Sequence, residues 1–367
     1  MITFLISILL LIAGYFLYGK FVERFIGVDP SRKTPAYDRE DGIDYMPMPT
    51  WKVFVIQFLN IAGLGPIFGA IMGAAYGPAA YLWIVIGCIF MGAVHDFFAG
   101  MMSIESTGAN MPDITGKYLG KTMKGVMSFV VSFLLLAVGV SFVTGPSDLI
   151  ASLTGVSKEI WLYVIFAYYL FATLLPIDKI IGSVYPYMGA ALLFMAVGVG
   201  VMLVVGDLRG THEMIELTPA TLKNWHFAPE SNILVPMLFI VISCGAISGF
   251  HSTQSPLMAR CLKNEKYARP VFYGAMIAEG VVAMIWATAA ISSTSIQSIC
   301  FKRSTICCFE GRASIIRRSL EICSLSPPFS SSWRLSLRLR GGWHCCERRA
   351  LSAICLTTTL ASASTDR

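Results

Sequence analysis

The sequence predicts an all-α integral membrane protein with about eight transmembrane helices. Hydrophobic residues make up 55% of its 367 residues, and the mean hydropathy is +0.67. Charged residues make up only 14%, whereas soluble domains carry about 25%. The apolar residues gather in long runs, and a helix needs about 20 of them to cross a bilayer. The sequence therefore excludes a soluble globular domain and predicts the lipid bilayer as the main partner.

Each apolar run is expected to form a helix, because backbone polar groups in lipid must hydrogen-bond within their own segment. The first run lacks both a basic segment before it and a small-residue cleavage site after it, so we expect a retained span rather than a signal peptide. The predicted spans lie at about 1–19, 51–76, 81–102, 124–142, 160–177, 184–205, 233–251 and 271–291.

The distribution of basic residues orients these spans. Residues 1–291 contain 17 Lys and Arg residues, and 14 of them lie on one side of the predicted membrane. That side holds loops 20–50, 103–123, 178–183 and 252–270, and the other holds loops 77–80, 143–159 and 206–232. Basic residues favour the cytoplasmic side. We therefore expect a multi-pass protein of the cytoplasmic (inner) membrane with its N-terminus outside.

The composition changes abruptly near Ile291. Residues 292–367 contain 16 Ser, ten Arg, one Lys and seven of the ten Cys, and no apolar run there approaches a span. Alanine codons (GCN) read one base out of frame become NGC triplets, which encode Ser, Arg, Cys and Gly. We expect 1–291 to be a truncated transmembrane domain and 292–367 to be out-of-frame translation. A natural disordered basic tail is the alternative, and resequencing the gene would decide between them.

The net charge of +6 comes from this tail, because residues 1–291 carry a net charge of −1 and the tail carries +7. No nucleic-acid partner is therefore expected for the main body. The adjacent cysteines of the tail, Cys307-Cys308 and Cys345-Cys346, lack C-x-x-C spacing. We accordingly expect no metal site.

The second predicted span contains Gly63, Gly65 and Pro66 near its middle. Proline lacks a backbone donor and glycine weakens a helix, so an unwound segment is expected here. Transporters use such broken helices to bind substrate near the bilayer midplane. The alternative is a kinked, continuous packing helix with small residues at its interface. The third glycine, Gly69, falls one position late for a dinucleotide-binding fingerprint.

Two other spans contain ionisable residues, His95-Asp96 in the third and Glu279 in the last. Ionisable residues inside membrane helices are costly and mark proton or ion pathways, and histidine titrates near neutral pH. We predict that His95, Asp96 and Glu279 take part in proton or ion coupling. The alternatives are structural hydrogen bonds or caps near a helix end.

The seventh predicted span ends in a polar segment that follows Gly245 and Gly249 and reaches Pro256. A second interrupted helix in one bundle points to a transport site. We predict a substrate-binding role for four polar residues, namely His251, Ser252, Thr253 and Gln254. A polar cytoplasmic turn is the alternative interpretation.

Several ordered motifs resemble those of the carbon starvation protein (CstA) family. In the first half they are GLGPIFG at 63–69, YLWIVIG at 81–87 and GAVHDF at 92–97. The others are VDPSRKTP at 28–35, DGIDY at 41–45, LPID at 175–178 and SGFHSTQSP at 248–256. The resemblance covers residues 14–291.

The resemblance implies a membrane transporter of the starvation response that takes up pyruvate or peptides, coupled to a cation gradient, with the proton as the expected ion. It also implies a fold similar to the LeuT-like (APC-type) inverted-repeat transporters, which have two broken helices. Family members continue with more spans after the position of Ile291. A nonfunctional truncated fragment is therefore an alternative to an active transporter.

Enzyme functions fit less well, and no cofactor is expected. An aspartyl intramembrane protease needs paired aspartates within the spans, and Asp96 stands alone. A haem-containing redox enzyme would need facing histidines, for which His95 and His251 are the only candidates within the spans.

Overall fold

The structure is a computed structural model that describes residues 1–173, 177–210, 213–226, 233–236, 238–239 and 250–300. The described residues form helices and one isolated β-bridge, between Met48 and Leu262. In chain order the helices are α1 (Ile2–Phe16), α2 (Tyr18–Ile26), α3 (Pro35–Asp38), α4 (Thr50–Ile61), α5 (Leu64–Ala74), α6 (Ala79–Ile86), η1 (Gly87–Gly92), α7 (Ala93–Glu105), α8 (Met111–Leu119), α9 (Lys121–Thr154), α10 (Lys158–Thr173), α11 (Ile177–Leu208), α13 (His251–Ala259), η2 (Glu265–Tyr267), η3 (Arg269–Tyr273) and α14 (Gly274–Cys300).

Among the described residues, five helical segments are long and apolar enough to cross a membrane, namely Ile2–Ile26, Ala79–Glu105, Lys121–Thr154, Gly189–Leu208 and Glu265–Ser292. A sixth forms if α4 and α5, which meet at a 45° bend, count as one broken span. The predicted span 160–177 corresponds to the 16-residue α10. The predicted span 233–251 lies mostly outside the described residues, so the total of eight stays a prediction.

The loop predicted at 178–183 is wrong, because α11 begins at Ile177 and continues to Leu208. The polar residues Asp178 and Lys179 mark the end of the apolar run. They do not end the helix, since a helix satisfies its backbone groups internally and can extend beyond the hydrocarbon core. Only its second part, Gly189–Leu208, is apolar enough to span. The tail prediction concerns residues that lie mostly outside the described part, although α14 itself continues to Cys300.

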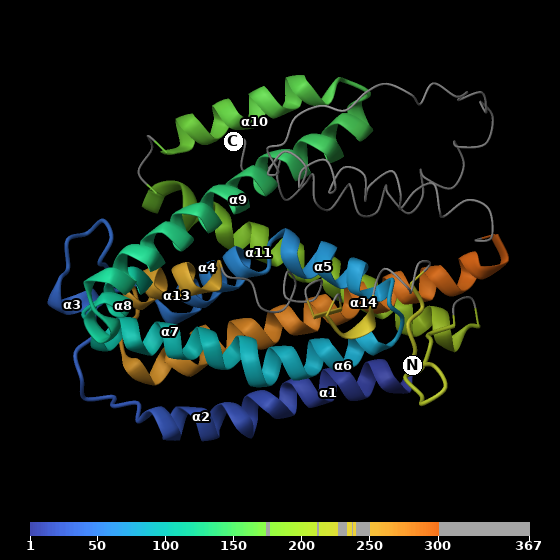
Figure 1. Ribbon diagram of the computed structural model, residues 1–367, viewed down its shortest axis with the longest axis horizontal. Coiled ribbons are helices and arrows are strands. Elements are labelled where there is room, and N and C mark those ends of the chain that lie inside the picture. The colour runs from blue at the N-terminus through green and yellow to red at the C-terminus, as the bar shows by residue number, and fades with distance from the viewer. Residues whose placement is uncertain (174–176, 211–212, 227–232, 237, 240–249, 301–367) are drawn as a thin grey trace.

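Helix α14 lies at the centre of the bundle (Figure 1) and packs against α1, α4, α5, α6 and α11. Glycines allow these close approaches. A Cβ atom at Gly280 would lie 2.7 Å from Cys88 Sγ, and one at Gly14 would lie 2.7 Å from Ile89 Cγ1. Small residues at helix interfaces let membrane helices pack by van der Waals contact.

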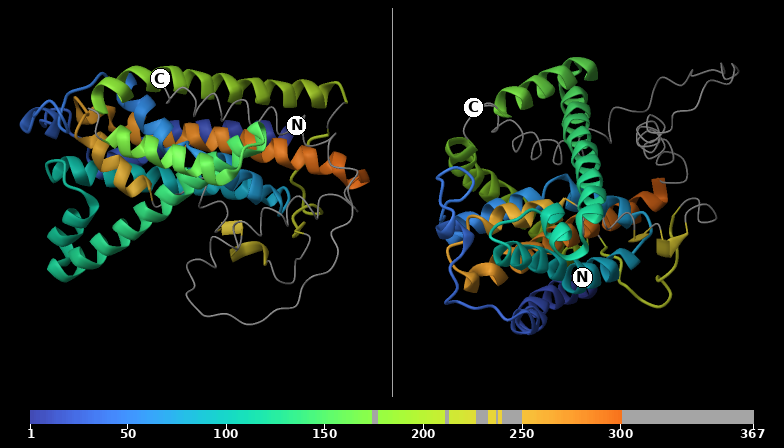
Figure 2. Two further views of the ribbon diagram at one scale, coloured as in Figure 1. Left: turned by 90° about the horizontal axis from the view of Figure 1, so that it is seen from above. Right: turned by 60° about the vertical axis from the view of Figure 1, so that its left-hand side comes forward.

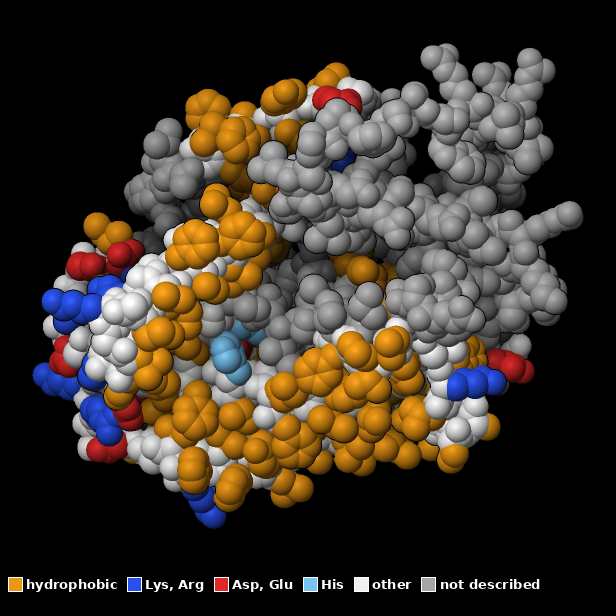
Figure 3. All heavy atoms as spheres, in the orientation of Figure 1, with side chains coloured by type: hydrophobic (Ala, Val, Ile, Leu, Met, Phe, Trp, Pro, Cys, Tyr) orange, Lys and Arg blue, Asp and Glu red, His pale blue; other side chains and the backbone are white. Residues whose placement is uncertain are grey.

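Helices α9 and α10 form a hairpin that diverges from the bundle, as Figure 2 shows. None of the apolar window of α9 is buried, and Phe129 and Leu136 on its surface are 73% and 71% exposed. Apolar side chains also cover the flank of the bundle in Figure 3, with charged side chains gathered at its ends. This distribution fits a protein whose flanks face lipid.

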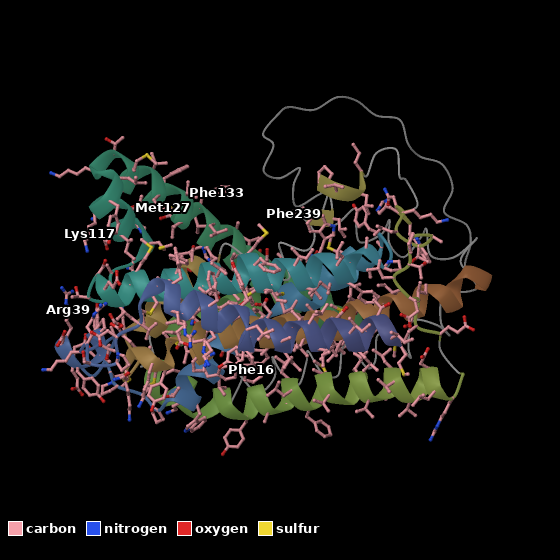
Figure 4. The ribbon with its side chains drawn as sticks, turned by 90° about the horizontal axis from the view of Figure 1, so that it is seen from below. Phe16, Arg39, Lys117, Met127, Phe133 and Phe239 are labelled. Carbon is pink, nitrogen blue, oxygen red and sulfur yellow. The ribbon has the colours of Figure 1, made fainter. Side chains whose placement is uncertain are left out.

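The loops expected on the basic side meet at one end of the bundle. Met48 N donates to Cys261 O at 3.1 Å, and Arg260 Nε donates to Gly108 O at 2.9 Å. Figure 4 shows Arg39 and Lys117 at this same end. The loops that the charge pattern groups together therefore lie together, and their assignment to the cytoplasm stays a prediction.

The opposite end carries the N-terminus and the segment after α11. The Glu216 carboxylate accepts hydrogen bonds from Ile2 N and Thr3 N, which places an anion at the N-terminus of α1, where a helix favours one. The Trp225 ring packs against Gly77, because a Cβ there would lie 2.7 Å from Trp225 Cγ. This segment thus covers the ends of α1 and α5.

Candidate functional site

The break between α4 and α5 lies inside the bundle. Helix α4 ends at Ile61 and α5 begins at Leu64, and Gly63 between them has a ψ of −130°, far from helical values. Pro66 occupies the first turn of α5 together with Gly65, where a missing N–H is tolerated. The interruption predicted from these residues is therefore present. The first amide groups of α5 have no acceptor within their own helix and carry partial positive charge.

Three ionisable side chains follow helical irregularities. The π-helix η1 leads directly into α7, where His95 and Asp96 are the third and fourth residues. The π-helix η3 leads in the same way into α14, which carries Glu279. A π-turn shifts the register of the following side chains and often occurs at functional sites. The Tyr273 hydroxyl of η3 donates to the Ile89 carbonyl of η1 at 3.0 Å, so one hydrogen bond joins the two π-helices.

A buried histidine joins these two helices. His251, the first residue of α13, is 1% exposed. Its Nδ1 lies 3.5 Å from Asp96 Oδ1, and its Nε2 lies 3.7 Å from Glu279 Oε2. Both carboxylates are also buried, at 0% and 1% exposure. One imidazole thus bridges two carboxylates from two other helices, and we call Asp96, His251 and Glu279 the acid–histidine cluster.

His95 connects this cluster to the protein surface. Its Nδ1 lies 3.1 Å from Asp96 Oδ1, although neighbouring helical residues point about 100° apart. Its side chain is 39% exposed, in contrast to the buried Asp96. Figure 3 shows histidine side chains at the surface within the apolar flank. The two histidines therefore converge on one carboxylate, with His95 on the outer side and His251 on the inner side.

The polar residues of α13 divide between two faces of the helix. His251, Gln254 and Ser255 are buried on one face, as their i, i+3 and i+4 spacing requires. Ser252 and Thr253 are half-buried on the other side, and the Thr253 hydroxyl donates to Phe250 O at 2.7 Å. Of the four residues predicted here, the structure brings only His251 and Gln254 to the face that holds the cluster.

Gln57 is a buried polar residue that the sequence analysis overlooked. It lies on α4, has 0% exposure, and its Nε2 donates to Ser255 Oγ at 3.1 Å. The signal in the sequence was an amide inside an apolar run, about one turn before a second amide, Asn60. Helix α4 packs against both α13 and α14, so this amide lies on the side of the bundle where the cluster is built.

The helix break and the cluster share neighbours. Helix α5 packs along α14, the helix that carries Glu279. On its other side the break is covered by α9, because a Cβ at Gly63 would lie 3.2 Å from Phe142 Cζ. Of the predicted substrate residues, Gly63, Gly65 and Pro66 thus line the break, one helix away from the cluster.

The charge of the cluster depends on its protons. The ion pairs that the structure shows for Asp96 and Glu279 involve only the two histidines. A buried carboxylate is costly unless it is paired or protonated, and groups this close bind protons as one unit. One proton on the imidazole and one on a carboxylate make the cluster neutral. Losing either proton leaves one net negative charge inside the bundle.

The arrangement is chemically suited to binding protons. Asp96 meets a histidine on each side rather than a second aspartate. Among the described side chains, no group of three or more His, Cys, Asp and Glu is arranged to hold a metal ion. Chemically, the cluster can take up and release protons next to a broken helix.

Comparisons with known proteins identify the family. The family model described as "Carbon starvation protein CstA" matches residues 1–145 and 126–314. An uncharacterized membrane protein of Haemophilus influenzae is 47% identical over 333 residues, which cover 78% of this chain and 89% of that protein. No solved structure matches this chain.

Relatives with named activities are more distant and longer. The peptide transporter CstA of Campylobacter jejuni is 27% identical over 337 residues, covering 74% of this chain and 47% of the relative. The pyruvate/proton symporter BtsT of Escherichia coli is 26% identical over 351 residues, covering 77% and 48%. This chain thus spans about half the length of these named transporters. With a family match over most of its length, the chain belongs to the carbon starvation protein CstA family.

Proposed function

We propose that this chain forms a transport bundle that moves a small nutrient, pyruvate or a peptide, across the cytoplasmic membrane, driven by a proton gradient. The observation that carries the proposal is the acid–histidine cluster, in which His251 bridges Asp96 and Glu279 from two other helices. Buried ionisable groups in membrane helices mark proton pathways. The names of the related transporters support the same class of function.

The coupling follows from the charge of the cluster. A protonated, neutral cluster is stable in a dry interior, whereas the deprotonated cluster favours a conformation that admits water. His95, which is partly exposed, is the group that exchanges protons with the cluster when the bundle opens to water. The two carboxylates then hold the proton until the bundle opens on the other side.

Substrate is proposed to bind at the break between α4 and α5. The free amides in the first turn of α5 attract a carboxylate group, which pyruvate and peptides both carry. No Lys or Arg lies near the middle of a predicted span in residues 1–291, so these amides at Gly65 and its neighbours are the main source of positive potential there. A fold of the LeuT-like inverted-repeat type is proposed on the same basis, since such folds place broken helices at the substrate site.

The test is uptake of labelled pyruvate and of a labelled dipeptide into proteoliposomes, with and without an imposed proton gradient. His251→Gln, Asp96→Asn and Glu279→Gln should each abolish gradient-driven accumulation. Asp113→Asn is the matched control, because Asp113 is 50% exposed and pairs with Lys124 at the surface, where such pairs contribute about 0–1 kcal/mol. Uptake by the cluster variants at the level of the wild type would refute the proposal.

A nonfunctional fragment is the competing proposal, motivated by the abrupt change of composition near Ile291. The predicted division of the chain at Ile291 is part of this competing proposal. A version of the chain with the reading frame restored after Ile291 should be tested beside this one. Uptake by the restored version alone would establish this chain as an inactive copy, whereas uptake by both would exclude that alternative.

A further inference from the structure

Gln57 occupies a position between the helix break and the acid–histidine cluster. It lies one turn before Ile61, where α4 ends, and it is fully buried. Its amide nitrogen donates to Ser255 Oγ at 3.1 Å. Ser255 follows His251 by four residues, so the two lie on the same face of α13. One hydrogen bond and one helical turn therefore connect Gln57 to the histidine of the cluster.

The carbonyl oxygen of this side chain is unused. Gln57 Oε1 is buried and has no hydrogen-bond partner among the described residues. Native proteins pair nearly all buried polar atoms, so an unpaired one calls for a ligand or ordered water. An amide oxygen accepts hydrogen bonds and cannot donate them. The missing partner must therefore supply an N–H or O–H group.

Other unpaired polar atoms gather at the same place. Buried side-chain atoms near the cluster that have neither a hydrogen bond nor an ion pair in the described part of the chain include Gln254 Nε2 and Asp96 Oδ2. Gln254 lies on α13 and Asp96 on α7, which packs against α13. One unpaired donor and one unpaired acceptor inside an apolar bundle are a second indication that a polar ligand belongs here.

We propose that Gln57 binds the substrate and links this binding to the proton occupancy of the cluster. Its oxygen accepts a hydrogen bond from an N–H or O–H group of the substrate, while its nitrogen holds Ser255 and, through α13, the His251 ring between the two carboxylates. The titratable groups that face this ring from the packed helices are Asp96 and His95 on α7 and Glu279 on α14. This inference rests on the proposed transport function.

The hydrogen bond to Gln57 Oε1 also determines which substrates the site prefers. A substrate with a hydrogen-bond donor beside its carboxylate, such as a dipeptide with its N–H groups, can satisfy Gln57 Oε1. A keto acid anion such as pyruvate carries acceptors only and cannot. Removing the amide should therefore impair the handling of dipeptide and leave that of pyruvate unchanged.

The experiment measures proton uptake or release on ligand binding, with a pH-indicator dye, for the full chain in weakly buffered detergent solution. In the wild type, adding a saturating dipeptide should change the number of bound protons. In Gln57→Met, which keeps the size and removes the amide, the dipeptide should bind about tenfold more weakly, as the loss of one hydrogen bond predicts. At saturation it should cause no proton change. Gln57→Glu, which keeps an acceptor oxygen, should restore most of the binding.

Ser147→Ala is the matched control for Ser255→Ala. Ser147 is also fully buried, and its hydroxyl also makes one hydrogen bond, to Val143 O, but it lies on α9. We expect Ser255→Ala to abolish the proton change and Ser147→Ala to leave it intact. Dipeptide-linked proton change of wild-type size in folded Gln57→Met or Ser255→Ala would overturn the inference.

The proteoliposome uptake assay distinguishes this inference from the proposed function. Absence of uptake in the wild type, together with a Gln57-dependent proton change on binding, would refute transport and support the link. Gradient-driven uptake in the wild type that Gln57→Met fully retains for dipeptide would support transport and refute the link. A wild type that shows neither uptake nor proton change would refute both.

Discussion

The contact between Gly280 and Cys88 provides a direct test of the packing around the cluster. A Cβ atom at position 280 would lie 2.7 Å from Cys88 Sγ, 3.1 Å from Cys88 Cβ and 3.4 Å from Leu11 Cδ2. Cys88 is itself completely buried, so Gly280→Ala must push α14 away from η1. Overpacking of this kind costs about 1–3 kcal/mol, partly offset by up to about 1 kcal/mol from the higher helix propensity of alanine.

We expect a net loss of about 1–2 kcal/mol for Gly280→Ala. Because 1 kcal/mol shifts the Tm of a domain of about 150–250 residues by about 2–4 °C, the Tm should fall by about 2–8 °C. The assay is the temperature at which the detergent-solubilised protein loses its monodisperse size-exclusion peak. Gly125→Ala is the matched control, because nothing lies within 4 Å of a Cβ at Gly125 on α9, and its Tm should not fall.

The double variant Gly280→Ala, Cys88→Ala isolates the contact itself. Removing Cys88 Sγ relieves the shorter of the two Cys88 contacts. The stability losses of the two single variants should therefore not add in the double variant. Residues in contact show coupling energies of about 0.5–3 kcal/mol in such cycles. A Tm for Gly280→Ala equal to that of the wild type, or strictly additive losses, would show that α14 and η1 do not pack as closely as the structure places them.

Two further predictions concern the ends of the bundle. Burial raises the pKa of Glu216, but hydrogen bonds from the N-terminal ammonium, the Thr3 side chain and the first amides of α1 outweigh it and lower this pKa from 4.5 to about 2. A carboxylate with a lowered pKa stabilises the fold above its ordinary pKa and loses that contribution as the pH falls toward 2. Glu216→Gln should therefore lower the Tm at pH 7, with a smaller difference at pH 3, and a difference that does not change with pH would contradict this reasoning. At the other end, Arg32 Nη1 lies 3.4 Å from the buried Glu265 and 3.4 Å from Glu105. Arg32→Ala leaves the buried Glu265 carboxylate without its ion-pair partner, so it should lower the Tm more than Lys33→Ala, whose side chain is exposed. Equal Tm values for the two variants would argue against a stabilising Arg32–Glu265 ion pair.

Several features of the fold follow directly from the sequence. Hydropathy predicts the membrane-spanning character and most of the spans, because lipid requires long apolar helices. Glycine and proline chemistry predicts the break near Gly63 and Pro66, since both residues weaken helical hydrogen bonding locally. The charge distribution also groups the loops that meet at one end. Each of these signals depends on residues that are near one another in the chain.

Other features depended on the tertiary structure. The beginning of α11 at Ile177 escaped hydropathy, because a helix can extend beyond its apolar part. Ser252 and Thr253 carried the same polar signal as Gln254, and only the packing of α13 decided which of them face the cluster. Gln57 gave little signal by itself, because the role of an amide in an apolar run shows only from its contact with Ser255.

The sequence by itself determined that this is a helical membrane protein with ionisable residues placed at a cost within its spans, and its motifs indicated the family. From the sequence alone, there was no sign that the candidate site residues His95, Asp96, His251 and Glu279 meet at one place. Only the tertiary structure decided that they form one cluster, in which His251 lies 3.5 Å from Asp96 and 3.7 Å from Glu279. The physical reason is that helix periodicity and hydropathy are local properties, whereas a buried charge is paired by whichever helix packs against it, and that helix can come from anywhere in the chain.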